Sequence, residues 1–131
     1  MSPGNVDVVR RLYSAISAVD VSDVIECVDP NAEWIPDSRV GEDPIAGRER
    51  LFEFFADRAS MFGEFEIEVE ELLERGDRVL AFLRLSGSGA ASGAGFEIRI
   101  AHLWTLREGK VVRGEGYGNR DEALEAAGLG E

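Results

Sequence analysis

Apolar residues recur at spacings of three and four in the first half of the chain, and this period is typical of amphipathic helices. Asn5 is placed to cap a first helix, whose apolar positions are Val6, Val9, Leu12, Tyr13, Ile16 and Val19. A shorter helix is predicted over Asp23–Val28, with Ser22 as its N-cap and Asp29-Pro30 as its end. A third helix follows Gly47 and carries Leu51, Phe54, Phe55 and Arg58 on one face, with Phe62 one turn beyond and Gly63 as its stop.

The period changes to two after the third helix, and such alternation predicts strands. Phe65, Ile67 and Val69 alternate with glutamates, so one face meets a core and the other meets water. Further strands are predicted at Val79–Ser86, Phe96–Leu106 and Val111–Gly118, with a short one at Ala32–Ile35 and loops at Pro36–Pro44 and Gly87–Gly95. Asn119 and Glu122 can cap a terminal helix over Asp121–Ala127, which Gly128 ends.

The strand Phe96–Leu106 has two different faces. One face carries Phe96, Ile98, Ile100, His102, Trp104 and Leu106, and the other carries Glu97, Arg99, Ala101, Leu103 and Thr105. Its hairpin neighbour has Gly114, Gly116 and Gly118 on a single face. These glycines indicate either a bulge or tight helix packing, or a face kept empty so that a ligand can lie against the sheet.

Helices followed by hairpin-linked strands predict an α+β fold, with helices on one face of an antiparallel sheet. A length of 131 residues fits one domain spanning the whole chain, without an internal repeat. A strongly curved sheet of this kind can enclose one pocket between its concave face and the helices. We therefore expect a single domain built around such a pocket.

Charge and cysteine content narrow the classes of partner. The chain has 14 basic and 26 acidic residues, a net charge of −12, which repels both nucleic acid and anionic membranes. No apolar run is long enough to span a bilayer, and we find no secretory signal. The single cysteine, Cys27, cannot form an internal disulfide and favours a reducing, cytoplasmic location.

His102 is the only histidine and the main candidate for proton chemistry. It is either a satisfied core residue or a polar group lining a cavity. One histidine without carboxylates at ligand spacing does not make a metal site, and the Gly87–Gly93 run leads into a strand where a dinucleotide site needs a helix. We therefore expect neither metal nor cofactor. Asp37, in the Pro36–Pro44 loop, is a candidate general base or a solvated carboxylate.

Several strings, in this order, resemble the SnoaL-like branch of the nuclear transport factor 2-like superfamily. They are Val9-Arg10-Arg11-Leu12-Tyr13, Asp20-Val21-Ser22-Asp23, Ala32-Glu33-Trp34, Ile45-Ala46-Gly47-Arg48-Glu49, His102-Leu103-Trp104 to Gly109-Lys110-Val111-Val112, and the ending from Asn119 to Leu129. The resemblance covers nearly the whole chain. It implies a cone-shaped α+β barrel with one deep apolar pocket, in a homodimer packed through the sheet. The superfamily includes ketosteroid isomerases, limonene-epoxide-hydrolase-like enzymes, polyketide cyclases, dehydratases and non-enzymatic domains.

Only some of the functional residues of these families have counterparts in this chain. His102 falls where the isomerases place an acidic hydrogen-bond donor and where the cyclases keep a histidine. Gly116 stands where the cyclases and epoxide hydrolases have a catalytic aspartate. The isomerase tyrosine falls on Ala15, and the isomerase loop base falls on or next to Pro36, which leaves Asp37 one place out of register. Of the hydrolase arginine and aspartate, only the arginine has a counterpart, Arg84.

Three hypotheses follow from these patterns. The first is a cofactor-free isomerase, cyclase, dehydratase or epoxide hydrolase acting on a small hydrophobic molecule, with His102 and Asp37 as catalytic residues and Glu115 as another titrating candidate. The pocket would be lined by Tyr13, Trp34, Phe54, Phe55, Ile100, Trp104, Gly116 and Gly118. The second is a non-catalytic hydrophobic-ligand-binding domain, and the third is a dimeric interaction module. For a homodimer, Ala101 and Leu103 beside Arg99 and Arg113 predict a mixed polar and apolar interface on the sheet.

Overall fold

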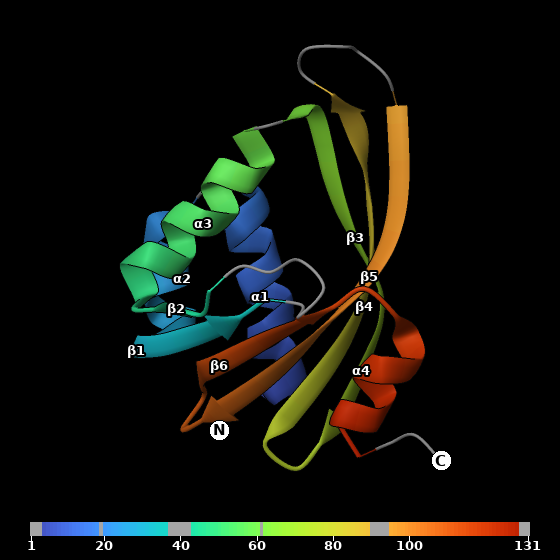
Figure 1. Ribbon diagram of the computed structural model, residues 1–131. Helices are drawn as coiled ribbons and strands as arrows, with labels where there is room; N and C mark the ends of the chain where they lie inside the picture. Colours follow the sequence, from blue (N-terminus) through green and yellow to red (C-terminus); the bar gives the residue numbers. More distant parts are fainter. Residues whose placement is uncertain (1–3, 19, 37–42, 61, 90–94, 129–131) are drawn as a thin grey trace.

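The computed structural model describes residues 4–18, 20–36, 43–60, 62–89 and 95–128. In chain order the elements are α1 (Asn5–Ala18), α2 (Val21–Cys27), β1 (Val28–Ile35), β2 (Ile45–Ala46), α3 (Arg48–Ser60), β3 (Phe62–Arg75), β4 (Arg78–Gly89), β5 (Gly95–Arg107), β6 (Lys110–Tyr117) and α4 (Arg120–Ala126). Figure 1 shows α1, α2 and α3 on one side of the long strands and α4 on the other. The predicted α+β class is confirmed.

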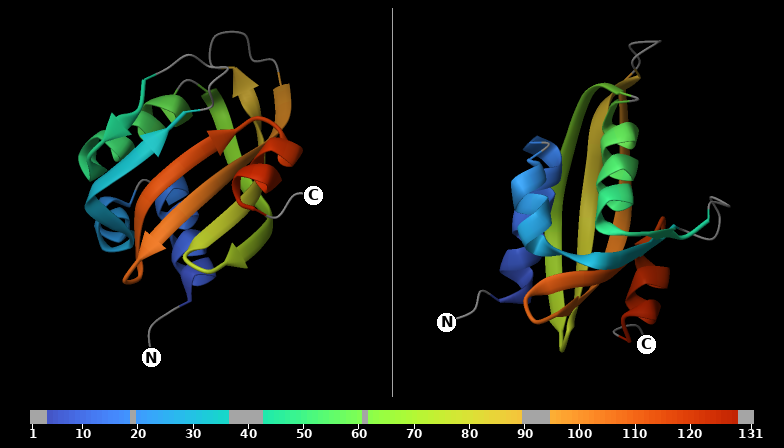
Figure 2. Two further views of the ribbon diagram at one scale, coloured as in Figure 1. Left: turned by 60° about the horizontal axis from the view of Figure 1, so that its bottom comes forward. Right: turned by 90° about the vertical axis from the view of Figure 1, so that its left-hand side faces the viewer.

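The strands form one six-stranded sheet in the order β2-β1-β6-β5-β4-β3. The pairs from β3 to β6 are antiparallel, as hairpin connections require, but β1 pairs with β6 in parallel. Figure 2 shows β1 and β6 side by side, pointing the same way. The expectation of a purely antiparallel sheet was wrong. The chain passes from β1 through α3 to the opposite edge of the sheet. No hairpin joins β1 to β6, so the two strands need not be antiparallel.

The N-terminal capping residue of α2 differs from the prediction, whereas that of α4 agrees with it. The carboxylate of Asp20 accepts a hydrogen bond from the N–H of Asp23 at 3.2 Å, so Asp20 is the N-cap of α2 and Ser22 lies inside the helix. The predicted cap of α4 is confirmed, because the side chain of Asn119 accepts bonds from two backbone N–H groups of its first turn.

Strand boundaries also differ from the prediction. β1 extends back to Val28, through Pro30, where its pairing with β6 is interrupted and no ladder bond requires an N–H. The sequence pattern did not predict β2, whose two residues pair with the end of β1. Phe62 begins β3, so α3 ends sooner than expected.

The inner core lies between α1, α2, α3 and the sheet. Its buried members include Val9, Leu12, Tyr13, Val24, Cys27, Trp34, Leu51, Val79, Leu83, Trp104 and Val111. Burial of this apolar surface is the main favourable contribution to folding. Cys27 is 2% exposed and burial raises the pKa of its thiol, so it acts as a small core residue, as expected.

A second core lies on the outer face of the sheet, under α4. Ala101 and Leu103 of β5 are each 1% exposed and pack with Leu80, Ala123 and Ala127. The alternation predicted for β5 is confirmed, since His102 and Trp104 belong to the inner face. The expectation that Ala101 and Leu103 contact a second copy was wrong, because α4 folds back and covers them.

Candidate functional site

His102 lies on the inner face of β5, at a junction of four aromatic side chains. Its side chain is 7% exposed. The ring centroids of Trp34, Trp104, Tyr13 and Phe55 lie 4.9, 5.6, 5.9 and 6.3 Å from that of the imidazole. These rings come from β1, β5, α1 and α3, so two strands and two helices together form the site. The Trp34 and Trp104 contacts are edge-on, a favourable geometry for aromatic rings.

Two buried hydrogen bonds order the imidazole. The Nε1–H of Trp104 donates to the hydroxyl oxygen of Tyr13 at 2.8 Å, and the same oxygen lies 2.8 Å from Nδ1 of His102. An indole can only donate, and a hydroxyl has one hydrogen of its own. All three groups are satisfied when Tyr13 donates to Nδ1. This assigns the proton of the imidazole to Nε2, which makes no hydrogen bond to any other residue in the described ranges.

Burial keeps the hydrogen-bonded pair uncharged. Desolvation lowers the pKa of His102 to about 3, and it raises the pKa of the Tyr13 hydroxyl. Desolvation is the single cause of the His102 shift among the described residues, so no carboxylate there favours its protonation. At neutral pH the imidazole is therefore a neutral hydrogen-bond donor at Nε2, suited to an acceptor oxygen.

The other residues predicted to line a pocket lie around this junction at different distances. Phe54 packs on Trp34 and Phe55, with ring centroids 6.4 and 5.4 Å away. Ile100 precedes His102 on the same face of β5 and packs against the inner core. Gly116 lies directly opposite His102 in the β5–β6 ladder, whereas Gly118 follows the end of β6 and is exposed.

The surroundings of Gly114 show why one of the three glycines predicted for the last strand is needed. Gly114 pairs with Trp104 on one side and with Trp34 on the other, and the two indoles meet over it with centroids 5.5 Å apart. A Cβ at this position would lie 2.7 Å from Cε3 of either indole. Packing against two indoles of the neighbouring strands, and not against a helix, therefore explains the glycine at 114.

Two of the other charged candidates, Glu115 and Arg84, do not meet His102. Asp37 lies outside the described residues. Glu115 lies on the opposite face of the sheet, where it accepts a hydrogen bond from Tyr117 at 3.1 Å. Arg84 is also on the outer face and binds Glu68 and Glu97. Strand alternation places Glu115 and Arg84 on the face of the sheet that points away from His102.

Sequence reasoning missed the role of Tyr13. The family resemblance pointed to Ala15 for the helix tyrosine, yet Ala15 is a buried core residue and the hydroxyl of Tyr13 is the one that reaches His102. The available signal was the position of Tyr13 in the buried stripe of α1. A buried tyrosine hydroxyl requires a hydrogen-bond partner, and His102 and Trp104 were the candidates on the facing strand.

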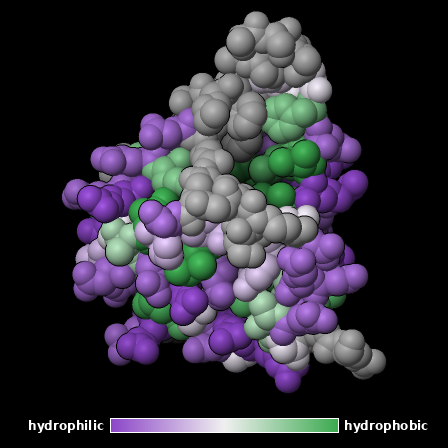
Figure 3. Space-filling model, in the orientation of Figure 1, coloured by the Kyte–Doolittle hydropathy of each residue, from purple (hydrophilic) through white to green (hydrophobic). Residues whose placement is uncertain are grey.

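The described residues also outline a small apolar cavity of about 20 Å³ beside this junction, between Leu12, Val24, Phe55 and Trp104. It has room for about one water molecule and is too small for a substrate. Figure 3 shows hydrophobic residues at the surface in several places, and Ile98 on the His102 face of β5 is 49% exposed. The apolar face of β5 therefore continues from the buried junction to solvent.

No helix in the described ranges is long and apolar enough to cross a membrane. The cytoplasmic location stays a prediction.

Comparison with known proteins identifies the family. Residues 9–114 match the family described as SnoaL-like domain, and the chain belongs to this family. None of the curated proteins matches the chain significantly. The fold is that of the nuclear transport factor 2-like proteins, as the sequence resemblance implied.

Three solved structures are similar along most of the chain. A proposed SnoaL-like polyketide cyclase from Jannaschia sp. CCS1 is 25% identical, with a TM-score of 0.78 over 86% of this chain and 83% of that one. TerC, co-crystallized with polyporic acid, is 22% identical, with a TM-score of 0.76 over 95% and 96%. An NTF2-like protein of unknown function from Burkholderia pseudomallei K96243 is 20% identical, with a TM-score of 0.75 over 92% and 95%.

Proposed function

We propose that the chain binds a small, largely apolar molecule through an oxygen that accepts a hydrogen bond from Nε2–H of His102. The observation that carries this proposal is the hydrogen bond between Tyr13 and Nδ1, which leaves Nε2 as the donor of a neutral imidazole. The surrounding aromatic rings favour an apolar or aromatic ligand body. The pocket itself is part of the proposal, with the curved sheet enclosing it and the exposed apolar end of β5 at its mouth.

The first candidate activity is a cofactor-free isomerisation or cyclisation of a carbonyl compound. In such reactions negative charge develops on the carbonyl oxygen, and a preorganised neutral donor stabilises it in a water-poor site. Neutral imidazoles and protonated carboxyls serve as such donors in other enzymes. Asp37 is the proposed base. The Jannaschia protein, itself a proposed polyketide cyclase, supports this class of chemistry, and the polyporic acid bound to TerC supports a ligand with an extended apolar body.

The second candidate is ligand binding without turnover. Two observations favour it: Gly116, opposite His102, offers no carboxylate, and no carboxylate among the described residues contributes to the pKa of His102. In this case His102 selects the ligand and no proton moves. Dehydration and epoxide opening need a carboxylate or a bound water near the imidazole, which makes them less suited to the described geometry.

A panel of aromatic ketones and quinones tests the proposal, with thermal unfolding to detect binding and mass spectrometry to detect conversion. Ligand binding raises the unfolding temperature, because the ligand binds only the folded chain. His102→Gln and His102→Asn form a matched pair: the Gln amide nitrogen reaches the place of Nε2, whereas the Asn amide mimics Nδ1 and ends short of it. We expect His102→Gln to retain much of the stabilisation and His102→Asn to lose it.

The products distinguish the two candidates. A converted product that disappears in His102→Asn supports the enzyme, and stabilisation without conversion supports the binding protein. Equal stabilisation of the wild-type protein and His102→Asn by every ligand in the panel would reject the role of His102 in both.

A further inference from the structure

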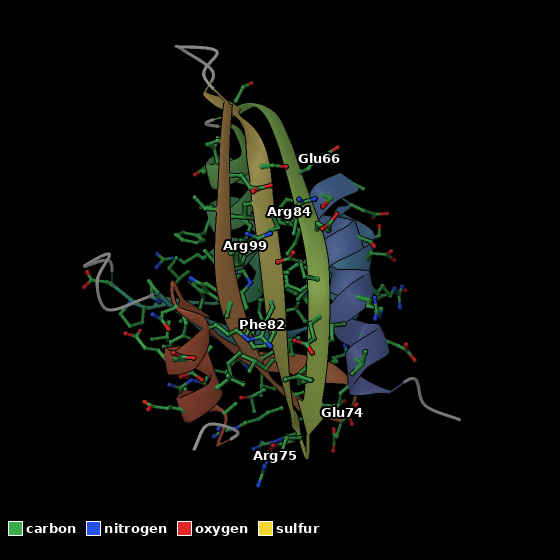
Figure 4. All side chains as sticks on the ribbon, turned by 90° about the vertical axis from the view of Figure 1, so that its right-hand side faces the viewer. Glu66, Glu74, Arg75, Phe82, Arg84 and Arg99 are labelled. Atoms are coloured by element: carbon green, nitrogen blue, oxygen red, sulfur yellow. The ribbon has the colours of Figure 1, made fainter. Side chains whose placement is uncertain are left out.

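A second concave site lies outside the His102 junction, between α1 and the edge strand β3. It is an open groove of about 600 Å³. Figure 4 shows α1 running beside β3 at this edge of the sheet. Its walls differ in character: Ile67 and Val69 of β3 are half-buried and apolar, whereas Arg10, Ser14 and Ser17 of α1 are exposed and polar.

The polar wall follows from the helix period. Positions 10, 14 and 17 are separated by four and three residues, so they share one face of α1 over a length of about 10 Å. Tyr13 closes the inner side of the groove, and its hydroxyl is turned to His102. The groove is therefore separated from the His102 junction by the Tyr13 ring.

Arg10 is the charged side chain among the residues that line this groove. Its neighbour Arg11 is neutralised twice, by Asp23 at 2.7 Å and by Glu26. Arg10 forms no ion pair with any residue in the described part of the chain, although the chain has 26 acidic residues. The Ser14 and Ser17 hydroxyls likewise make no hydrogen bond to another described residue. An unpaired guanidinium beside free hydroxyls and an apolar wall is complementary to an anion with an apolar tail.

We propose that the groove between α1 and β3 binds a small amphipathic carboxylate. Its carboxylate binds the guanidinium of Arg10, with Ser14 or Ser17 as an additional donor, and its apolar chain lies on Ile67 and Val69. A singly charged carboxylate fits better than a phosphate, because one guanidinium is present and the net charge of −12 repels a dianion more strongly. This site goes beyond the proposed function and does not depend on it.

Octanoate is the probe, with 1-octanol and acetate as controls, in an NMR titration that follows backbone amides. We expect octanoate to shift amides of α1 and β3 around the groove, and to bind more tightly than octanol, which lacks the charge, and than acetate, which lacks the chain. Arg10→Gln should weaken octanoate binding about tenfold or more, as expected for loss of a charged hydrogen bond. Glutamine has a similar helix propensity and position 10 is exposed, so this variant folds.

Arg50→Gln is the matched control. Arg50 is an exposed arginine of α3 that does not line the groove, and its replacement changes the net charge by the same amount. Unchanged octanoate binding in Arg50→Gln, together with the loss in Arg10→Gln, supports the site. Equal weakening in the two variants, octanol binding as tight as that of octanoate, or amide shifts confined to the His102 junction would each overturn it.

Discussion

The hydroxyl of Tyr13 and Nδ1 of His102 lie 2.8 Å apart, although 89 residues separate them in the chain. This contact joins the first helix to the fifth strand inside the core. The same hydroxyl accepts the indole N–H of Trp104, so one oxygen satisfies two polar groups of β5. Both the stability of the inner core and the tautomer of the proposed ligand donor depend on this atom.

Tyr13→Phe should destabilise the fold without changing its apolar packing. Loss of the oxygen leaves the indole N–H of Trp104 and Nδ1 of His102 buried without their partner, and each such group costs about 1–3 kcal/mol. We expect the free energy of unfolding, measured in urea, to fall by about 2–4 kcal/mol. Tyr117→Phe is the matched control, because its hydroxyl donates to the partly exposed Glu115 and its loss should cost about 1 kcal/mol or less. Equal losses in the two variants would contradict the role assigned to Tyr13.

The neutral imidazole makes stability depend on pH. Burial lowers the pKa of His102 to about 3, whereas a histidine in the unfolded chain has a pKa of about 6.5. Below about pH 6.5 the unfolded chain therefore binds a proton that the folded chain excludes, and acid favours unfolding. This contribution grows by about 1.4 kcal/mol per pH unit as the pH falls toward the folded pKa.

The pH effect is measured by urea unfolding of the wild-type protein and His102→Gln between about pH 7 and pH 5. Titration of the carboxylates is common to the two proteins and cancels in the comparison. We expect the wild-type protein to lose about 2 kcal/mol more than the variant over this range. Parallel pH profiles would show that His102 titrates normally in the folded state.

The two faces of β5 could be predicted from sequence because they depend on local alternation. His102 and Trp104 share a face with Ile100, and Ala101 and Leu103 share the other, as the pattern requires. The partners of these faces could not be predicted in the same way. Burial of Leu103 under α4 depends on how the end of the chain folds back over the sheet, and no local pattern encodes it.

For Tyr13, the sequence pattern offered candidate partners but could not predict which of them its hydroxyl meets. The period of α1 places Tyr13 in a buried stripe, but its hydroxyl reaches His102 only because of how α1 packs over β5. The parallel pairing of β1 with β6, which sets Trp34 beside Gly114, also depends on a long connection rather than on local sequence. Sequence patterns therefore predicted which side chains face inward, and long-range packing decided which of them meet.

Gly114→Ala should be poorly tolerated. The new methyl group would lie 2.7 Å from Cε3 of both Trp104 and Trp34, so the indoles or the strands must move apart. Overpacking of this kind costs about 1–3 kcal/mol, which thermal or urea unfolding measures. Gly95→Ala is the control, because among the described residues its methyl group would meet the Gly87 carbonyl oxygen alone, at 3.8 Å. If Gly114→Ala is as stable as Gly95→Ala, the two indoles do not require this glycine.

For the homodimer that the family resemblance implies, we expect an interface on the part of the outer sheet face that α4 leaves uncovered. Figure 4 shows Arg84 and Arg99 on this face. Arg84 binds Glu68 at 3.0 Å and Glu97 at 3.1 Å, so opposite charges alternate across the strands. A patch that carries both signs can pair with its own copy about a twofold axis, where each arginine meets a glutamate of the other chain.

We expect light scattering to report a dimer at micromolar concentration that weakens as salt is added, because exposed charges are screened. Arg99→Glu should shift the protein to a monomer, since its side chain is 65% exposed and reversal places like charges across the twofold axis. Arg107→Glu, at the exposed end of the same strand, carries the same charge change and should remain dimeric. A wild-type monomer at about 100 µM, or equal loss of the dimer in both variants, would rule out this face as the interface.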